Sequence, residues 1–140
     1  MKVDLTRRYK FCASHRLHNP AFSDGHNRQV YGKCNNPHGH GHNYVLWVTV
    51  SGPVDQRTGM VCNLADLDDC VQQEVIERFD HQNLNLMPEF AELVPTSENL
   101  AVCIDGILQR NFCCVAVERV RLEETASNSF EYAQRDELAR

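Results

Sequence analysis

The sequence has no long run of hydrophobic residues, no low-complexity segment and no block of like charge. A membrane-spanning helix needs about 20 consecutive apolar residues, so we expect no membrane span and no membrane partner. Residues 1–8 also lack the apolar segment of a secretory signal peptide. These absences together predict a cytoplasmic protein.

Basic residues are scarce as well. The chain has 14 Lys and Arg against 19 Asp and Glu, which gives a formal net charge of -5 and a pI near 5.8. Proteins that bind nucleic acids normally carry a basic surface, so we expect no nucleic-acid partner. At 140 residues the chain is long enough to bury a core without covalent staples. We therefore predict one domain over residues 1–140.

The seven cysteines are odd in number and lack the spacing of a disulfide framework. This pattern favours a reducing compartment and free thiols. Cys34 stands apart because it lies in a polar stretch rich in Asn and Gly, next to Lys33. The other six lie in apolar-periodic stretches and are expected to be small buried residues: Cys12, Cys62, Cys70, Cys103, Cys113 and Cys114.

Three histidines alternate with glycines just after Cys34, at His38, His40 and His42, and a β-rich stretch follows directly. Side chains of a strand repeat every two residues, so two such imidazoles lie on one face and can bind one metal ion. We prefer His40 and His42, which adjoin the predicted strand, although His38 also occupies an alternate position. His15 ends the preceding predicted strand, and antiparallel pairing would bring it close as a third ligand.

The role of Cys34 has two interpretations. As a fourth ligand it would close a structural zinc site, since catalytic zinc sites usually have three protein ligands and an open position. Alternatively, the Cys34 thiolate is a base or nucleophile beside an open metal, with a pKa lowered by the ion and by Lys33.

Two acidic positions are further candidates. Asp80 and His81 form an adjacent carboxylate–imidazole pair that could work as an acid–base relay with a thiol. Glu124 ends a strand of Val and Leu residues and shares their alternation. If it points inward, its desolvation needs a partner, which a flat heterocycle with an amino group and a ring N–H would supply. A solvated strand-end glutamate is the alternative.

The hydrophobic patterning predicts an α+β fold. Strands are expected over residues 3–13, 42–51, 115–125 and 130–133, and an exposed loop over residues 18–29. One helix should begin after Asn63 and end near Phe79, and a second should run from Thr96 to about Gln109. Helices grouped apart from antiparallel strands are typical of the α+β class.

The chain resembles the 6-pyruvoyltetrahydropterin synthase family over nearly its full length. The resemblance rests on ordered motifs at matching separations: Phe11-Cys12-Ala13-Ser14-His15-Arg16-Leu17, Tyr31-Gly32-Lys33-Cys34-Asn35-Asn36-Pro37, Gly39-His40-Gly41-His42-Asn43-Tyr44, Gly59-Met60-Val61, Asn63-Leu64-Ala65-Asp66-Leu67, Asp80-His81-Gln82-Asn83-Leu84-Asn85, Thr96-Ser97-Glu98-Asn99-Leu100 and Glu124-Thr125.

The resemblance implies a tunnelling fold, in which a four-stranded antiparallel sheet carries two helices on one face. Subunits of this family close into trimeric barrels, and two trimers stack into a homohexamer with active sites between subunits. By the family pattern His15, His40 and His42 hold Zn2+, and Cys34 is the base. Asp80 and His81 complete the relay from a neighbouring subunit, Glu124 anchors the pterin, and Thr96, Ser97 and Glu98 form a further pterin-contacting segment.

The implied reaction converts 7,8-dihydroneopterin triphosphate into 6-pyruvoyltetrahydropterin with loss of triphosphate, a carbon–oxygen lyase step. Mg2+ often accompanies such a polyphosphate substrate, and Arg16 and Lys33 are candidate triphosphate contacts. The spacing from Cys34 to His40 and His42 is typical of these pyruvoyl synthases. The alternative pair His38 and His40 has the shorter spacing of 6-carboxytetrahydropterin synthases of 7-deazapurine biosynthesis, which share substrate, metal and fold.

Overall fold

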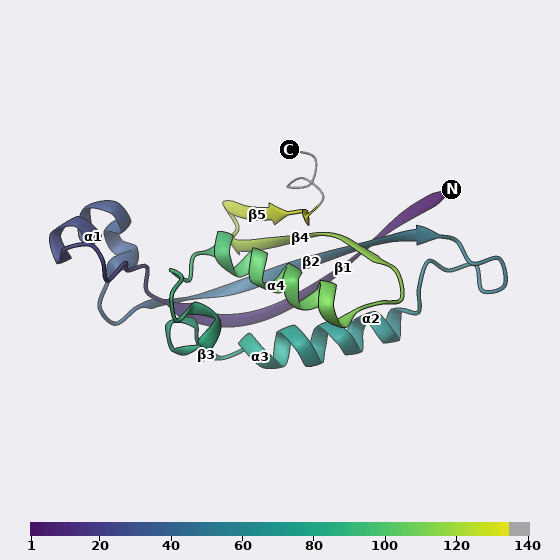
Figure 1. Ribbon diagram of the computed structural model, residues 1–140, viewed down its shortest axis with the longest axis horizontal. Helices are drawn as coiled ribbons and strands as arrows, with labels where there is room; N and C mark the ends of the chain where they lie inside the picture. Colours follow the sequence, from purple (N-terminus) through teal and green to yellow (C-terminus); the bar gives the residue numbers. More distant parts are fainter. Residues whose placement is uncertain (135–140) are drawn as a thin grey trace.

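The computed structural model describes residues 1–134, in which one long sheet is covered by helices on a single face (Figure 1). The main elements in chain order are β1 (Lys2–His15), α1 (Asp24–Tyr31), β2 (His40–Pro53), α2 (Leu64–Val71), α3 (Glu77–Phe79), β3 (Gln82–Asn83), α4 (Ser97–Asn111), β4 (Ala116–Thr125) and β5 (Asn128–Tyr132). A π-helical turn, Gln72–Ile76, joins α2 to α3, and short 3-10 turns lie at Gly32–Asn35, Leu84–Leu86 and Pro88–Phe90.

The strand order in the sheet is β3-β1-β2-β4-β5. β1 and β2 form a long antiparallel pair, from Lys2 opposite Pro53 to His15 opposite His40. β4 and β5 add two more antiparallel strands, so the predicted four-stranded antiparallel sheet and the α+β class are confirmed. β3 was not predicted: it pairs in parallel with the end of β1 over two residues, too few for a sequence pattern.

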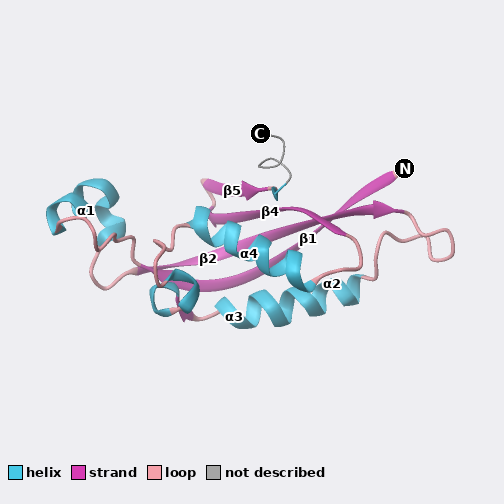
Figure 2. Ribbon diagram, in the orientation of Figure 1, coloured by secondary structure: helices cyan, strands magenta, loops and turns pink. Residues whose placement is uncertain are grey.

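The core lies between the sheet and the helices α2, α3 and α4 (Figure 2). Alternate residues of β2 face the helices, and Leu46, Val48 and Val50 are fully buried there. Leu122 of β4 lies opposite Leu46 and is fully buried too. Because side chains alternate along a strand, Leu46 and Val48 point to the same face of the sheet, and the helices cover that face.

The two predicted main helices are confirmed. The Asn63 side chain caps α2 by accepting the Ala65 N–H, and the Thr96 side chain caps α4 by accepting the Asn99 N–H. Arg7 of β1 forms an ion pair with Asp68 of α2 at 2.7 Å, which ties this helix to the sheet. In the described part of the chain, no helix combines the length and apolar character that crossing a membrane requires.

Two expectations were wrong. Residues 18–29 are not a loop throughout, because Ser23 caps α1 there and Gly32 ends it with a positive φ of 57°. α1 buries only Asn27, so it has no apolar stripe for a pattern search to find. Cys113 and Cys114 are exposed rather than buried, and the other five thiols, all free, are only partly buried.

Leu122 tests the packing of this core. We expect Leu122→Ala to lower the free energy of unfolding by about 2–5 kcal/mol, because it removes a fully buried side chain between sheet and helices. The matched control is Leu86→Ala at an 82 % exposed leucine, which should change it by less than about 0.5 kcal/mol. Urea unfolding at one fixed protein concentration gives the free energy of unfolding of both variants. An equal loss of stability in the two variants would contradict this packing.

Candidate active site

Three histidines converge where β1 ends and β2 begins. His15 and His40 are opposite each other in the antiparallel register, and His42 lies two residues further along β2. Each offers one ring nitrogen as a ligand atom, and these atoms all lie within 4.8 Å of one another. The two adjacent strands thus assemble the group that the sequence predicted as metal ligands.

The three imidazoles face the helix-covered side of the sheet. His42 shares the alternation of Tyr44 and Leu46, which are fully buried in the core, and its ring centroid lies 5.6 Å from that of Tyr44. His15 is itself only 2 % exposed. The site therefore lies at the end of the hydrophobic core, where a bound ion would be shielded from water on one side.

The donor set fits a zinc ion. His15 Nδ1 lies 2.7 Å from the carbonyl oxygen of Pro95. Donation of the Nδ1 proton to that oxygen leaves His15 Nε2 free as a ligand, and Nε2 lies 3.1 Å from His40 Nε2. His42 Nε2 is buried and has no hydrogen-bond partner among residues 1–134. A buried polar atom of this kind normally has a partner, and a metal ion would supply one.

Burial also favours the protonation state that binds metals. It lowers the pKa of His15 and of His42, each against the opposing effect of nearby groups such as Glu124. Neutral imidazole is the form that ligates a transition metal. His38 is exposed and belongs to no cluster of possible ligands among residues 1–134, so the structure groups His40 with His42 rather than with His38.

Glu124 lies beside this site. It accepts a short hydrogen bond from the Ser97 hydroxyl at the start of α4 and a second one, at 3.3 Å, from the Asn128 amide. Burial acts to raise the pKa of Glu124, but these hydrogen bonds and the neighbouring His42 and His15 outweigh it, and the pKa lies below its usual value. Glu124 is therefore a partly buried carboxylate, and the alternative of a fully solvated strand end does not hold.

The segment Thr96, Ser97 and Glu98 divides into different roles. The Thr96 hydroxyl is engaged in capping α4, Ser97 is 1 % exposed and bonds Glu124, and Glu98 is exposed to solvent. Of these three described residues, only Ser97 forms a hydrogen bond with Glu124. Its hydroxyl orients the carboxylate.

Cys34 lies on the 3-10 turn Gly32–Asn35, which packs against the chain just after β1. The Leu17 N–H donates to the Cys34 carbonyl at 2.9 Å, and the buried Asn35 amide donates to the Leu17 carbonyl at 2.8 Å. These bonds place the Cys34 turn two residues beyond His15. Cys34 does not join the cluster of the three histidines, so the geometry does not favour a closed site with a fourth thiolate ligand.

Asp80 and His81 lie where α3 gives way to β3. His81 Nδ1 is 3.0 Å from Asp80 Oδ2. The pKa of Asp80 lies below its usual value, chiefly because its carboxylate accepts the Cys12 N–H, at 2.9 Å. Among the described residues, Asp80, His81 and Cys34 do not form a cluster, so one chain alone does not bring the predicted relay together.

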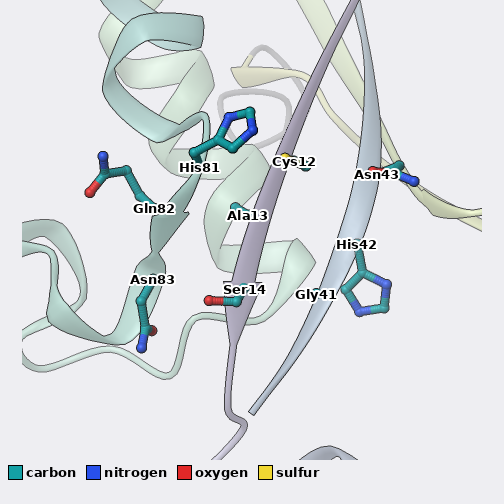
Figure 3. A pocket seen from close by; sticks show the side chains of 9 residues that line it. All are labelled: Cys12, Ala13, Ser14, Gly41, His42, Asn43, His81, Gln82 and Asn83. Atoms are coloured by element: carbon teal, nitrogen blue, oxygen red, sulfur yellow. The ribbon is translucent and has the colours of Figure 1, made fainter. Parts of the chain in front are cut away.

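A hollow opens beside the Asp80–His81 pair. It has a volume of about 470 Å³, and its lining residues come from β1, β2, β3 and His81, which directly precedes β3 (Figure 3). Its lining includes Ser14, Gly41 and Asn43, which alternate with the helix-facing residues of their strands. His81 is therefore reached from the uncovered face of the sheet. The three histidines face the other side, although His42 also lines the edge of this hollow.

The two candidate triphosphate contacts share a second hollow, of about 630 Å³. Arg16 and Lys33 line it together with Arg28 of α1, and Asp24 is the acidic residue at its rim. The Arg16 guanidinium also donates to the Asn35 carbonyl at 3.0 Å, which holds this side chain against the Cys34 turn. Arg28 was not predicted as a candidate contact because its helix, α1, has no periodic apolar pattern.

The sequence of this chain matches those of known proteins. The family model described as 6-pyruvoyl tetrahydropterin synthase matches residues 4–135. The chain belongs to this family. Its relatives include a 6-pyruvoyl tetrahydrobiopterin synthase of Drosophila melanogaster, 47 % identical over 130 residues that cover 91 % of this chain and 77 % of the relative.

A solved structure of the family has the same fold. The Caenorhabditis elegans 6-pyruvoyl tetrahydropterin synthase superposes with a TM-score of 0.91 at 39 % identity, covering 95 % of this chain and 96 % of that one. A more distant relative in Archaeoglobus fulgidus is named a putative 6-carboxy-5,6,7,8-tetrahydropterin synthase. It is 38 % identical over 104 residues, which cover 74 % of this chain and 82 % of the relative. Membership of the family is thus carried by both sequence and fold.

Proposed function

We propose that this protein is a zinc-dependent 6-pyruvoyltetrahydropterin synthase. It would act on 7,8-dihydroneopterin triphosphate and release triphosphate, as a carbon–oxygen lyase of tetrahydrobiopterin-type biosynthesis. The observation that carries the proposal is the cluster of His15, His40 and His42 with the carboxylate of Glu124 on the same face of the sheet. A metal site next to a pterin anchor is what this reaction requires.

His15, His40 and His42 would hold the zinc ion, with an open position for substrate. When bound, zinc would act as a Lewis acid on the substrate's side-chain hydroxyls and acidify the adjacent C–H and O–H bonds. The Pro95 carbonyl keeps the His15 ring in the tautomer and orientation that this requires.

Glu124 would anchor the pterin ring. Its ionised carboxylate can accept hydrogen bonds from an amino group and a ring N–H, and such bonds to a charged acceptor are among the strongest. Ser97 keeps one oxygen in place, and Thr96 and Glu98 flank it. The ring would then lie against the wall formed by the start of α4.

Cys34 would act as the base that removes a side-chain proton. Asp80 and His81 would return a proton to the ring, with Asp80 orienting the imidazole. Because these two groups are not brought to Cys34 within one chain, we infer that a neighbouring subunit supplies them. A homohexamer built from two trimeric barrels would do so.

Arg16 and Lys33 would contact the triphosphate, with Mg2+ accompanying it. Both line the hollow beside the Cys34 turn, and cationic groups at this position match the charge of the leaving group. No nucleic acid or membrane enters this function, and the predicted cytoplasmic location is compatible with it.

The product distinguishes this proposal from the 6-carboxytetrahydropterin synthase alternative, which the Archaeoglobus relative favours. We expect pure zinc-loaded protein, incubated with dihydroneopterin triphosphate, to release triphosphate without acetaldehyde. The assay measures both compounds over the same time course. Acetaldehyde formed in proportion to turnover would contradict the pyruvoyl activity and establish the carboxy-forming one, while absence of any turnover would contradict both.

A further inference from the structure

A second group of possible metal ligands lies outside the histidine site. Cys12, Asp80 and His81 each offer one ligand atom, and these atoms all lie within 4.8 Å of one another. Cys12 is on β1, and Asp80 and His81 directly precede β3, which pairs with β1. Figure 3 shows His81 beside the strand that carries Cys12. In the proposed function Asp80 and His81 form the proton relay, and the Cys12 thiol has no role.

The backbone holds the three residues together in a defined way. The Cys12 N–H donates to Asp80 Oδ1 at 2.9 Å, and the His81 N–H donates to the Cys12 carbonyl at 2.6 Å. Both main-chain polar groups of Cys12 are therefore bonded to the Asp80–His81 pair. His81 has a φ of 61°, which is uncommon for a residue with a side chain and is maintained by these contacts.

The group is open to ions from solvent. The hollow of about 470 Å³ is lined by both Cys12 and His81. The His81 side chain is 79 % exposed and that of Asp80 is 35 % exposed. Within a single chain, an ion can thus reach the three ligand atoms without opening the fold.

We propose that Cys12, Asp80 and His81 bind a second zinc ion, at a site separate from the three histidines. Ligand atoms around a tetrahedral zinc lie roughly 3.5 Å apart, a spacing that small side-chain rotations of this group can reach. One thiolate, one imidazole and one carboxylate are all zinc ligands, and the thiolate disfavours Mg2+ and Ca2+. Water would fill the remaining position.

Occupation of this site would inhibit the enzyme. A zinc ion bound to a ring nitrogen of His81 prevents that nitrogen from carrying the proton of the relay. A zinc ion bound to Asp80 engages the carboxylate that would otherwise orient the imidazole. This consequence for turnover rests on the proposed function, in which His81 is a proton donor. Binding of the ion itself does not depend on it.

The test uses the full chain with Cys113→Ser and Cys114→Ser, which removes the two exposed thiols that would also bind a thiophilic ion. The protein is first loaded with zinc to fill the histidine site and is then titrated with Co2+. We expect a second equivalent to bind with a thiolate-to-cobalt charge-transfer band in the near ultraviolet. Adding Cys12→Ser should abolish the band and weaken binding at least 10-fold, whereas adding Cys34→Ser should preserve both.

Zinc inhibition is measured in parallel on two proteins: the Cys113→Ser, Cys114→Ser protein and the same protein with Cys12→Ser added. Each rate is expressed relative to that protein's own rate at one zinc equivalent. The zinc concentration that halves the rate should be at least 10-fold lower for the protein that retains Cys12. The proposal is overturned if no charge-transfer band forms, if Cys12→Ser retains it, or if Cys34→Ser removes it. Failure of the proposed function looks different: the band forms and depends on Cys12, but neither protein turns over the substrate.

Discussion

Cys34→Ala is expected to lower kcat by about 10²- to 10⁴-fold while zinc remains bound. A positioned general base contributes this much to a proton transfer. The Cys34 thiol does not cluster with the three histidines, so its removal leaves their ligand atoms in place. Initial rates with dihydroneopterin triphosphate and the zinc content of the purified protein are the two measurements.

The control for this variant is Cys114→Ala, which removes an exposed thiol far along the chain and should keep the full rate. Loss of zinc and of the folded state together in Cys34→Ala would show that Cys34 is a ligand of a closed structural site. Retention of full turnover with zinc bound would remove Cys34 from the mechanism.

His42→Ala is expected to lower zinc affinity by more than about 100-fold. Loss of a residue that only hydrogen-bonds to a ligand lowers affinity by about 10- to 100-fold, and loss of a ligand itself should cost more. His42 Nε2 is buried and has no hydrogen-bond partner in the described part of the chain, so a bound ion would be the partner that this variant loses. Turnover should fall together with bound zinc. Competition with a chelator of known affinity and rates at matched zinc loading separate the two effects.

The matched control is His38→Ala, four residues upstream on the exposed part of the same stretch. We expect it to keep both zinc and turnover. If His38→Ala lost zinc and His42→Ala kept it, the ligand pair would be His38 and His40, and the shorter spacing of the carboxy-forming relatives would apply.

Most of the fold could be predicted because it follows local patterns. The β-rich stretch after His42 predicted a strand, and Asn63 and Thr96 marked helix starts that the structure confirms. The failures have a common cause. α1 buries one residue and β3 pairs through two, so neither leaves a periodic hydrophobic signal.

The candidate site could be predicted only in part, for a similar reason. His40 and His42 are two residues apart, so their shared face follows from strand geometry alone. The Pro95 contact of His15 and the Ser97 contact of Glu124 join residues far apart in the chain. Arg28 joined the cationic hollow only once α1 was known.

The sequence by itself determined the class of the fold, the family and a set of alternating histidines that could hold a metal ion. These depend on residue spacing, which a chain carries before it folds. Only the tertiary structure showed that the Glu124 carboxylate is partly buried and hydrogen-bonded by Ser97 and Asn128. It also showed that Cys34 lies outside the histidine cluster and that Cys12 lies beside Asp80 and His81. Such contacts depend on strand register and on the path between elements, which local patterning does not specify.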